Sequence, residues 1–150
     1  MQPAAAIYTG KRRGELRQLD LLQVEERIRA VLPDFPQVAG AYLFGSVLDF
    51  VRPQSDIDLG LILRRENPDP WEEVTDVLVE TRLGRIGPHP FQVTVLRRAQ
   101  GNFAFRVLTR GRLVYVDDPL WVADFIEAVA RNHADWAPFL HTYEVARGRA

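Results

Sequence analysis

Apolar residues recur along this chain at two different spacings, which predict helices and strands. Between residues 21 and 32 they follow a helical repeat, with Asp20 in front as an N-cap and Pro33 behind as a stop. A continuous apolar run at residues 39–44 predicts a buried strand, and residues 55–63 predict a second one. We therefore expect a helix and two strands in the first half of the chain, with a short helical turn between the strands.

The second half of the chain continues this alternation with further helices and strands. Its patterns predict a helix at residues 68–84, a strand at 91–96, a helix at 102–110, a strand at 113–116 and helices at 120–131 and 134–147. Because strands and helices alternate, the sequence predicts an α/β (α+β) fold with a small sheet of about four strands flanked by helices.

The N-terminal segment, residues 1–19, differs from the rest of the chain. It shows no periodic apolar pattern and carries the basic run Lys11-Arg12-Arg13. We interpret it as a flexible or loosely docked arm, and residues 20–150 as the folded domain.

An aromatic stripe runs along the two predicted C-terminal helices. Its members are Trp121, Phe125, Trp136, Phe139 and Tyr143. Aromatic side chains at helical spacing are more often core than binding groove, so we expect these residues to pack against the sheet.

Composition narrows the class of protein. The chain has 19 basic and 20 acidic residues among 150, so it has no basic field that would attract long duplex nucleic acid. No run approaches the roughly 18 consecutive apolar residues that span a bilayer. The absence of cysteine excludes disulfides and thiolate zinc sites and fits a reducing compartment, so we expect a cytoplasmic protein.

Polar residues interrupt the first two strands at positions that suggest chemistry. The first strand breaks at Gly45-Ser46, a turn whose free backbone N–H groups could hold a phosphate. In the second strand, alternation places Asp56 and Asp58 on one face and Ile57 on the other. Adjacent carboxylates repel each other, and the usual reason to keep them is a divalent cation such as Mg²⁺ that also binds a substrate phosphate.

The Gly-Ser turn followed by Asp-x-Asp on the next strand resembles the minimal nucleotidyltransferases of the DNA polymerase beta superfamily. The resemblance covers roughly residues 21–147 and implies a polymerase-beta-like fold, in which the small sheet is mixed and C-terminal helices follow it. It also implies a site in which a third carboxylate, on a following strand, completes the metal site and helps to deprotonate the acceptor. The residues to which it assigns roles are Gly45, Ser46 and Ser55 for the nucleotide and Asp56 and Asp58 for the metal ion and catalysis.

The chain departs from this family at the third carboxylate. Alignment of the third strand with the family pattern puts Gln92 where an aspartate is expected. Its amide oxygen could still bind a metal ion weakly, but it brings no negative charge and cannot accept a proton at neutral pH. Gln92 therefore joins the catalytic set as a weakened member, and Asp49 or Glu66 would be the substitute base if their geometry allowed it.

His89 is the remaining residue with possible metal chemistry. It lies between two prolines in the loop before the third strand, and no other histidine is near it in sequence. We interpret it as a turn residue rather than a metal ligand, because zinc and similar ions need several such side chains together.

Three functions are compatible with these observations. The leading hypothesis, which the resemblance implies, is a Mg²⁺-dependent nucleotidyltransferase that moves AMP from ATP onto a HEPN-domain ribonuclease toxin encoded nearby, and so acts as its antitoxin. The alternative is a degenerate antitoxin that binds and occludes its partner, which Gln92 favours. A small-molecule nucleotidyltransferase is the third, although such enzymes usually carry an added C-terminal domain for which this chain is too short. The nucleotide, the acceptor and any oligomer are left open.

Overall fold

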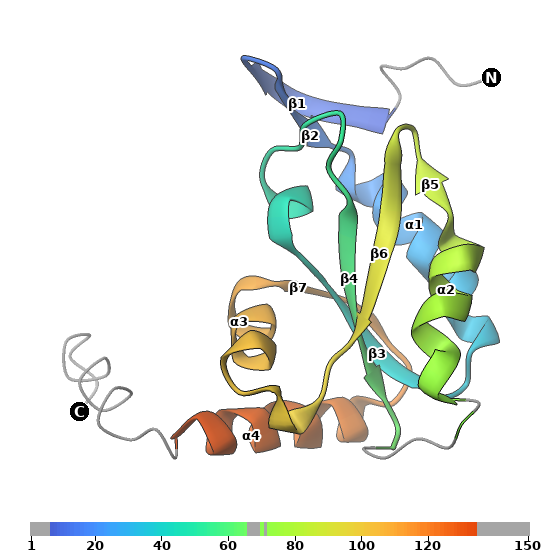
Figure 1. Cartoon of the computed structure of the whole chain (residues 1–150), viewed down its shortest axis with the longest axis vertical. Coiled ribbons are helices and arrows are strands. Elements are labelled where there is room, and N and C mark those ends of the chain that lie inside the picture. Colours follow the sequence, from blue (N-terminus) through green and yellow to red (C-terminus); the bar gives the residue numbers. More distant parts are fainter. Residues whose placement is uncertain (1–6, 66–69, 71, 135–150) are drawn as a thin grey trace.

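The computed structural model describes residues 7–65, 70 and 72–134, and Figure 1 shows their arrangement. The strands are β1 (Tyr8–Arg13), β2 (Leu16–Leu19), β3 (Val38–Phe44), β4 (Ile57–Leu63), β5 (Arg85–Ile86), β6 (His89–Val95) and β7 (Arg112–Val116). The α-helices are α1 (Leu21–Val31), α2 (Thr75–Leu83), α3 (Asn102–Arg110) and α4 (Pro119–Ala134). Short 3₁₀ helices are η2 (Leu32–Asp34), η3 (Gly45–Leu48), η4 (Glu72–Val74) and η5 (Arg98–Gln100).

One mixed sheet contains five of these strands in the order β5-β6-β4-β3-β7. The middle strand, β4, runs antiparallel to β3 and parallel to β6. The predicted mixed sheet flanked by helices is therefore confirmed, and the fifth strand is the two-residue β5, which is too short to give an apolar pattern. Because β4 has a neighbour on each side, the residues at its start are held in register from both directions.

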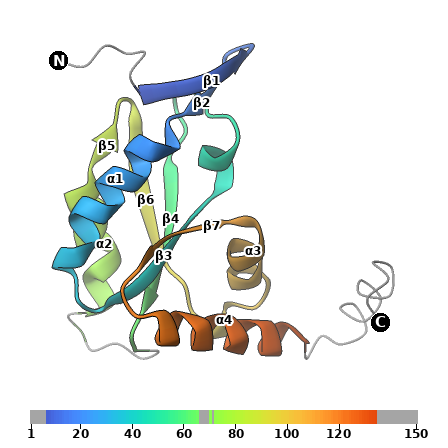
Figure 2. The ribbon, with the colours of Figure 1, turned by 180° about the vertical axis from the view of Figure 1, so that it is seen from behind.

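Helices cover the two faces of this sheet in pairs. α1 and α2 contribute to the apolar cluster on one face, and α3 and α4 contribute to the cluster on the other. Figure 2 shows α1 in front of the sheet and α4 across its lower end. On the α3/α4 face, β4 joins the apolar cluster only through Ile62, so the start of β4 on that face is left to other kinds of residue.

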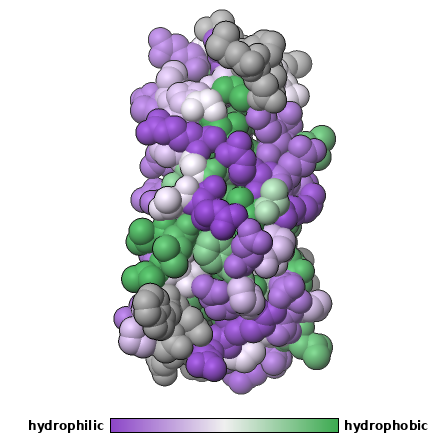
Figure 3. All heavy atoms as spheres, turned by 90° about the vertical axis from the view of Figure 1, so that its right-hand side faces the viewer, coloured by the Kyte–Doolittle hydropathy of each residue, from purple (hydrophilic) through white to green (hydrophobic). Residues whose placement is uncertain are grey.

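The surface on the side of β5 and α2 is mostly hydrophilic (Figure 3). α2 buries Val79 and Leu83 and leaves Val77 and Leu78 exposed. None of the helices in the described part of the chain combines the length and the apolarity that crossing a membrane would require.

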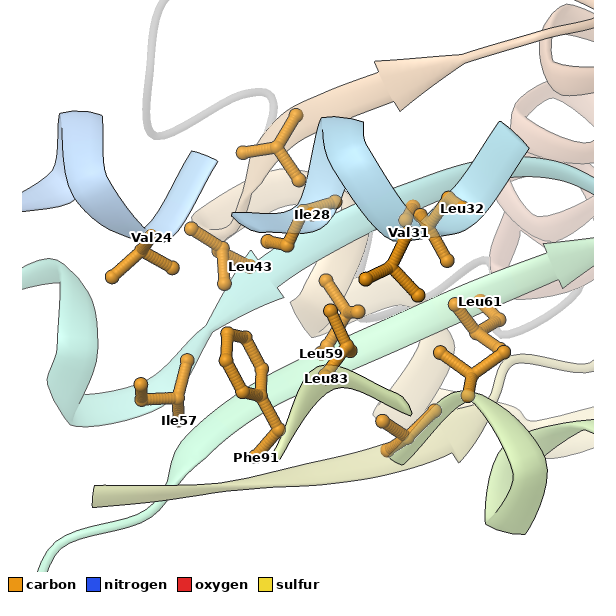
Figure 4. Close-up of a cluster of buried hydrophobic side chains, with 14 of the residues drawn as sticks. Val24, Ile28, Val31, Leu32, Leu43, Ile57, Leu59, Leu61, Leu83 and Phe91 are labelled. Atoms are coloured by element: carbon orange, nitrogen blue, oxygen red, sulfur yellow. The ribbon is translucent and has the colours of Figure 1, made fainter. Parts of the chain in front are cut away.

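The larger core lies between β4 and α1 (Figure 4). Ile57, Leu59 and Leu61 of β4 are fully buried there, together with Val24 and Ile28 of α1. The alternation predicted for this strand is confirmed, because every second residue faces the same core.

Most helix boundaries follow the sequence signals. Asp20 caps α1 by accepting a hydrogen bond from Leu22 N at 3.1 Å, and Pro33 lies in the 3₁₀ helix that ends it. The helix predicted at residues 68–84 begins later, at Thr75, and residues 66–69 and 71 lie outside the described residues.

The C-terminal prediction is tested only in its first half. α4 matches the helix predicted at 120–131, and nearly all of the helix predicted at 134–147 lies outside the described residues. Phe125 is 2% exposed and Trp121 packs against the same cluster, so core packing is confirmed for these two members of the aromatic stripe. The members beyond the described residues are Trp136, Phe139 and Tyr143.

Residues 8–19 form a β-hairpin, which corrects the expected flexible or loosely docked arm. β1 and β2 pair antiparallel with Tyr8 opposite Leu19, and Leu19 is buried in the larger core. Arg17 and Val51 exchange two backbone hydrogen bonds, at 2.7 and 3.0 Å, which attach the hairpin to the segment before β4. The hairpin lies across the end of the sheet at which β4 and β6 begin (Figure 1). Only Leu19 of the four residues of β2 is buried, so these short strands show almost no apolar alternation and the sequence did not reveal the hairpin.

Candidate active site

Asp56 directly precedes β4 and Asp58 is its second residue, and both lie on the face opposite the larger core. Ile57 and Leu59 are fully buried on the α1 side, so alternation turns the carboxylates toward the other face. Both carboxylates are only partly exposed, and both lie within hydrogen-bonding distance of one amide group, that of Gln92. The structure thus brings together the two acidic residues that the sequence singled out.

Gln92 occupies the position beside Asp58 on the neighbouring strand. The parallel register of β4 and β6 pairs Asp58 with Gln92. In the amide orientation that satisfies its hydrogen bonds, the Gln92 nitrogen donates to Asp58 Oδ1 at 3.1 Å and to Asp56 Oδ2 at 3.3 Å. The side chain at the expected third position therefore does meet the carboxylate pair, and it meets it as a neutral hydrogen-bond donor.

Gly45 brings the backbone of the turn against Asp58. Phe44, the last residue of β3, pairs with Asp58, and Gly45 follows it with φ of +79° as η3 begins. A Cβ atom at Gly45 would lie 2.5 Å from Asp58 Oδ2, closer than such atoms approach. Only glycine combines this backbone angle with this contact. Phe103 of α3 packs edge-on against Phe44, with 5.7 Å between ring centroids, and supports the strand end.

Ser46 and Ser55, the other two residues assigned to the nucleotide, differ in what their side chains do. Ser46 is exposed in η3, beside Gly45. The Ser55 hydroxyl accepts a hydrogen bond from Arg52 N at 2.9 Å, and Ser55 N donates to Arg52 O at 3.0 Å. Ser55 therefore closes a turn in front of β4.

Asp49 and Glu66 were the possible substitute bases. Asp49 follows η3 and lines a cavity of about 280 Å³ together with Asp20 and Arg112, whereas Glu66 lies outside the described residues. Within the described residues no group of three or more His, Cys, Asp or Glu side chains is placed to hold a metal ion, so Asp49 does not complete the carboxylate pair.

Burial and charge act in the same direction on Asp58. Partial burial raises the pKa of Asp58 above its ordinary value, and the neighbouring Asp56 carboxylate raises it further. The ionised pair therefore lowers the stability of the fold, and the hydrogen bonds from Gln92 offset part of this loss. A bound cation would offset it more completely.

The donor set fits a divalent cation of the Mg²⁺ type. Two carboxylates supply oxygen ligands and negative charge, and Mg²⁺ needs only one or two carboxylates when water and substrate phosphates fill its other positions. Gln92 can add a carbonyl oxygen if its amide turns over. No stronger ligand cluster competes with the pair in the part of the chain that the structure describes.

His89 is a residue whose importance the sequence did not reveal. It is fully buried, with Nδ1 2.8 Å from Ser55 O and Nε2 2.8 Å from the Tyr8 hydroxyl. The interpretation of His89 as an ordinary turn residue is therefore wrong, because its ring joins the hairpin to the start of β4. A cavity of about 520 Å³ lies beside this contact, with Tyr8 and Pro88 in its lining.

Comparisons with known proteins give a family and a fold. The family described as Polymerase beta, Nucleotidyltransferase matches residues 26–120. No curated protein matches the chain. Among solved structures, the chain is similar to a mutant of the toxin–antitoxin complex MntA-HpeT, with 18% identity, coverage of 84% of this chain and 98% of that one, and a TM-score of 0.50.

Two further solved structures have TM-scores below 0.50. One is a tri-AMPylated Shewanella oneidensis HEPN toxin in complex with an MNT antitoxin, with 18% identity, coverage of 83% of this chain and 98% of that one, and a TM-score of 0.48. The other is a toxin–antitoxin complex with AMP-PNP, with 18% identity, coverage of 79% and 97%, and a TM-score of 0.45. At these identities the likeness concerns the fold.

Replacement of Gly45 tests the contact between the turn and the carboxylates. We expect Gly45→Ala to lower the free energy of unfolding by about 1–3 kcal/mol, because of its positive φ, and to weaken Mn²⁺ binding by displacing Asp58. The matched control is Gly84→Ala, which has φ of +68° and nothing within 4 Å of the added Cβ. Denaturant unfolding and Mn²⁺ titration of both variants separate strain from the contact. Equal Mn²⁺ affinity in the two variants would contradict the assignment of Gly45 to the site.

Neutralisation of Asp58 tests the repulsion within the pair. At neutral pH and without divalent cations, we expect Asp58→Asn to raise the thermal midpoint by a few degrees, while Asp124→Asn, an exposed change on α4, leaves it unchanged. The pKa of Asp58 is raised in the fold, so its carboxyl is least unfavourable when protonated, and the advantage of the variant should shrink as pH falls toward about 4. Thermal unfolding followed by circular dichroism measures both effects. A midpoint below that of the wild type would mean that hydrogen bonding to Gln92 outweighs the repulsion.

Proposed function

This chain belongs to the polymerase beta nucleotidyltransferase family, and from that membership we propose that it transfers AMP from ATP to a hydroxyl group of a protein partner. The observation that carries the proposal is the meeting of Asp56, Asp58 and Gln92 next to the Gly45 turn. This arrangement combines a cation site with a place where a backbone turn can approach phosphate oxygens.

The residues divide the work according to their chemistry. Asp56 and Asp58 would hold Mg²⁺, which when bound neutralises the charge of the phosphates at the reacting centre. Gly45 has no side chain to keep phosphates from the turn, and the exposed Ser46 hydroxyl can donate to a β- or γ-phosphate oxygen. Phe44, which pairs with Asp58 and contacts the Phe103 ring, precedes the turn on β3.

In the proposed reaction the acceptor hydroxyl oxygen bonds to the α-phosphorus of ATP. The bond from that phosphorus to the oxygen bridging the α- and β-phosphates breaks, and pyrophosphate leaves. Gln92 cannot take the hydroxyl proton, so the proton passes to solvent. Because phosphoryl and nucleotidyl transfer depend mainly on positioning and charge neutralisation, the lack of a base slows the reaction without preventing it.

The partner we propose is a HEPN-domain toxin encoded nearby, with this chain as its antitoxin in the cytoplasm. The solved structure with a TM-score of 0.50 is a toxin–antitoxin complex, which supports this pairing. The Gly-Ser turn and the Asp-x-Asp pair resemble the same class of antitoxins, which is a second line of support. Modification of the toxin by AMP would then be the means of inactivation.

A second candidate function is an antitoxin that acts by occlusion alone. The observation that favours it is the pair of hydrogen bonds from Gln92 to the carboxylates, which satisfies the pair without a cation. In this case the fold would serve as a binding surface and the transfer would be lost. The two functions differ in whether the partner gains mass.

The transfer is tested by removal of the carboxylate pair. The purified partner is incubated with ATP, Mg²⁺ and either the wild-type chain or the double variant Asp56→Asn with Asp58→Asn, and its intact mass is measured. We expect an added AMP with the wild type and none with the double variant, which should remain folded. Asp124→Asn is the control for a surface acid and should transfer as the wild type does. An unmodified partner in every sample, still bound and inactive, would reject transfer in favour of occlusion.

Restoration of a base tests the role of position 92. We expect Gln92→Asp to raise the rate of AMP transfer about tenfold or more, because general base catalysis typically contributes at least that much. Gln92→Asn keeps a neutral amide at the same place and should give no increase. Rates come from the time course of partner mass at saturating ATP. A flat or lower rate for Gln92→Asp would mean that proton removal is not limiting or that another group performs it.

A further inference from the structure

The Tyr8 hydroxyl, the His89 ring and the Ser55 carbonyl are joined by two consecutive, partly buried hydrogen bonds. Tyr8 comes from the N-terminal hairpin, His89 from the first residue of β6 and Ser55 from the turn before β4. Both links measure 2.8 Å, and His89 is fully buried. The rings of Tyr8 and His89 also pack edge-on, with 5.7 Å between their centroids.

The chemistry of the end groups determines which atom donates in each of these two hydrogen bonds. A backbone carbonyl only accepts, so His89 Nδ1 carries a hydrogen and donates it to Ser55 O. In the neutral ring Nε2 is then the acceptor, and the Tyr8 hydroxyl donates to it. Every polar atom of the imidazole is used, so the ring cannot rotate without leaving buried groups unsatisfied.

The Ser55 carbonyl belongs to the peptide unit that joins Ser55 to Asp56. A peptide unit is planar, so a hydrogen bond to its oxygen also fixes the orientation of the bond that leads to the Asp56 Cα atom. The parallel register of Ile57 with Phe91, continued backward, places this peptide beside His89 and Pro90. Proline has no N–H to give to the ladder, and the His89 side chain supplies the donor in its place.

We propose that His89 and Tyr8 are positioning residues for Asp56. Through their hydrogen bonds, the docked N-terminal hairpin fixes the orientation of this metal-binding carboxylate. This inference rests on the proposed function, since it assigns Asp56 to the metal ion. The hairpin then affects the site through the Tyr8 hydroxyl, and the turn at Ser55 affects it through its backbone carbonyl. Outer residues that orient metal ligands in this way typically affect metal affinity by about 10–100-fold.

Four variants separate positioning from general stability. His89→Leu removes both hydrogen bonds, Tyr8→Phe removes one hydroxyl, and His89→Asn keeps a donor near the place of Nδ1. Val79→Ala is the control, because Val79 is fully buried on α2 and takes no part in the hydrogen-bond chain. Mn²⁺ is titrated calorimetrically in the presence of AMP-PNP, at a temperature where circular dichroism finds each variant folded.

We expect His89→Leu to weaken Mn²⁺ binding about tenfold or more and Tyr8→Phe to weaken it about threefold. His89→Asn should recover most of the loss, and Val79→Ala should bind as the wild type does despite its lower stability. If His89→Leu binds Mn²⁺ as tightly as Val79→Ala, positioning is overturned.

Two further outcomes also decide the matter. Should His89→Leu fail to fold, wild-type affinity in Tyr8→Phe overturns the proposal, because that variant keeps the ring and its packing. A wild-type chain that binds no Mn²⁺ with AMP-PNP overturns the proposed function itself and the positioning role with it. If instead the wild type and His89→Leu bind Mn²⁺ equally well, only the positioning role is overturned and the proposed function stands.

Discussion

The burial of Ile57 is the constraint on which the candidate site depends. Ile57, which lies between Asp56 and Asp58 in the sequence, is fully buried in the larger core, and burial of such a side chain stabilises the fold by about 1.5–3 kcal/mol. Strand alternation then places Asp56 and Asp58 together on the opposite face. They lie together there although partial burial and the charge of Asp56 both raise the pKa of Asp58. Hydrophobic burial on one side of β4 thus maintains a repulsive pair on the other. The core, and not the carboxylate pair, therefore determines the orientation of the strand.

The surroundings of the pair come from three other parts of the chain. β3 delivers Gly45 against Asp58, β6 delivers Gln92 against both carboxylates, and the hairpin reaches Ser55 through His89. β4 is the middle strand, so β3 and β6 can each contribute from one side. The hairpin adds support at the end of β4 beyond the sheet ladder. This division explains how a small domain holds two like charges together with contacts that are mostly backbone or neutral.

The sequence could predict what depends on local pattern. The Asp20 cap, the alternation in β4 and the position of Gln92 all follow from spacing along the chain or from a family pattern, and the structure has each of them. The docking of the hairpin through Tyr8 and the role of His89 depend instead on a contact between residues 81 positions apart. A single histidine between prolines carries no sign of such a partner. The local signal was also ambiguous for β5, whose two residues give no period to read.

Gln92 changes the energetics of the site as well as its chemistry. A third carboxylate beside Asp56 and Asp58 would add a further repulsion whenever no cation is bound, whereas the Gln92 amide donates a hydrogen bond to each of the two. The same residue therefore removes a base and makes the cation-free state easier to maintain. The amide must also give up these two bonds if its oxygen is to face a cation, which weakens the advantage of binding one. Under AMP transfer, Gln92 gives a slower reaction in a site that is more stable without a cation. Under occlusion, Gln92 satisfies the carboxylates without a cation, so this surface is stable for binding a partner.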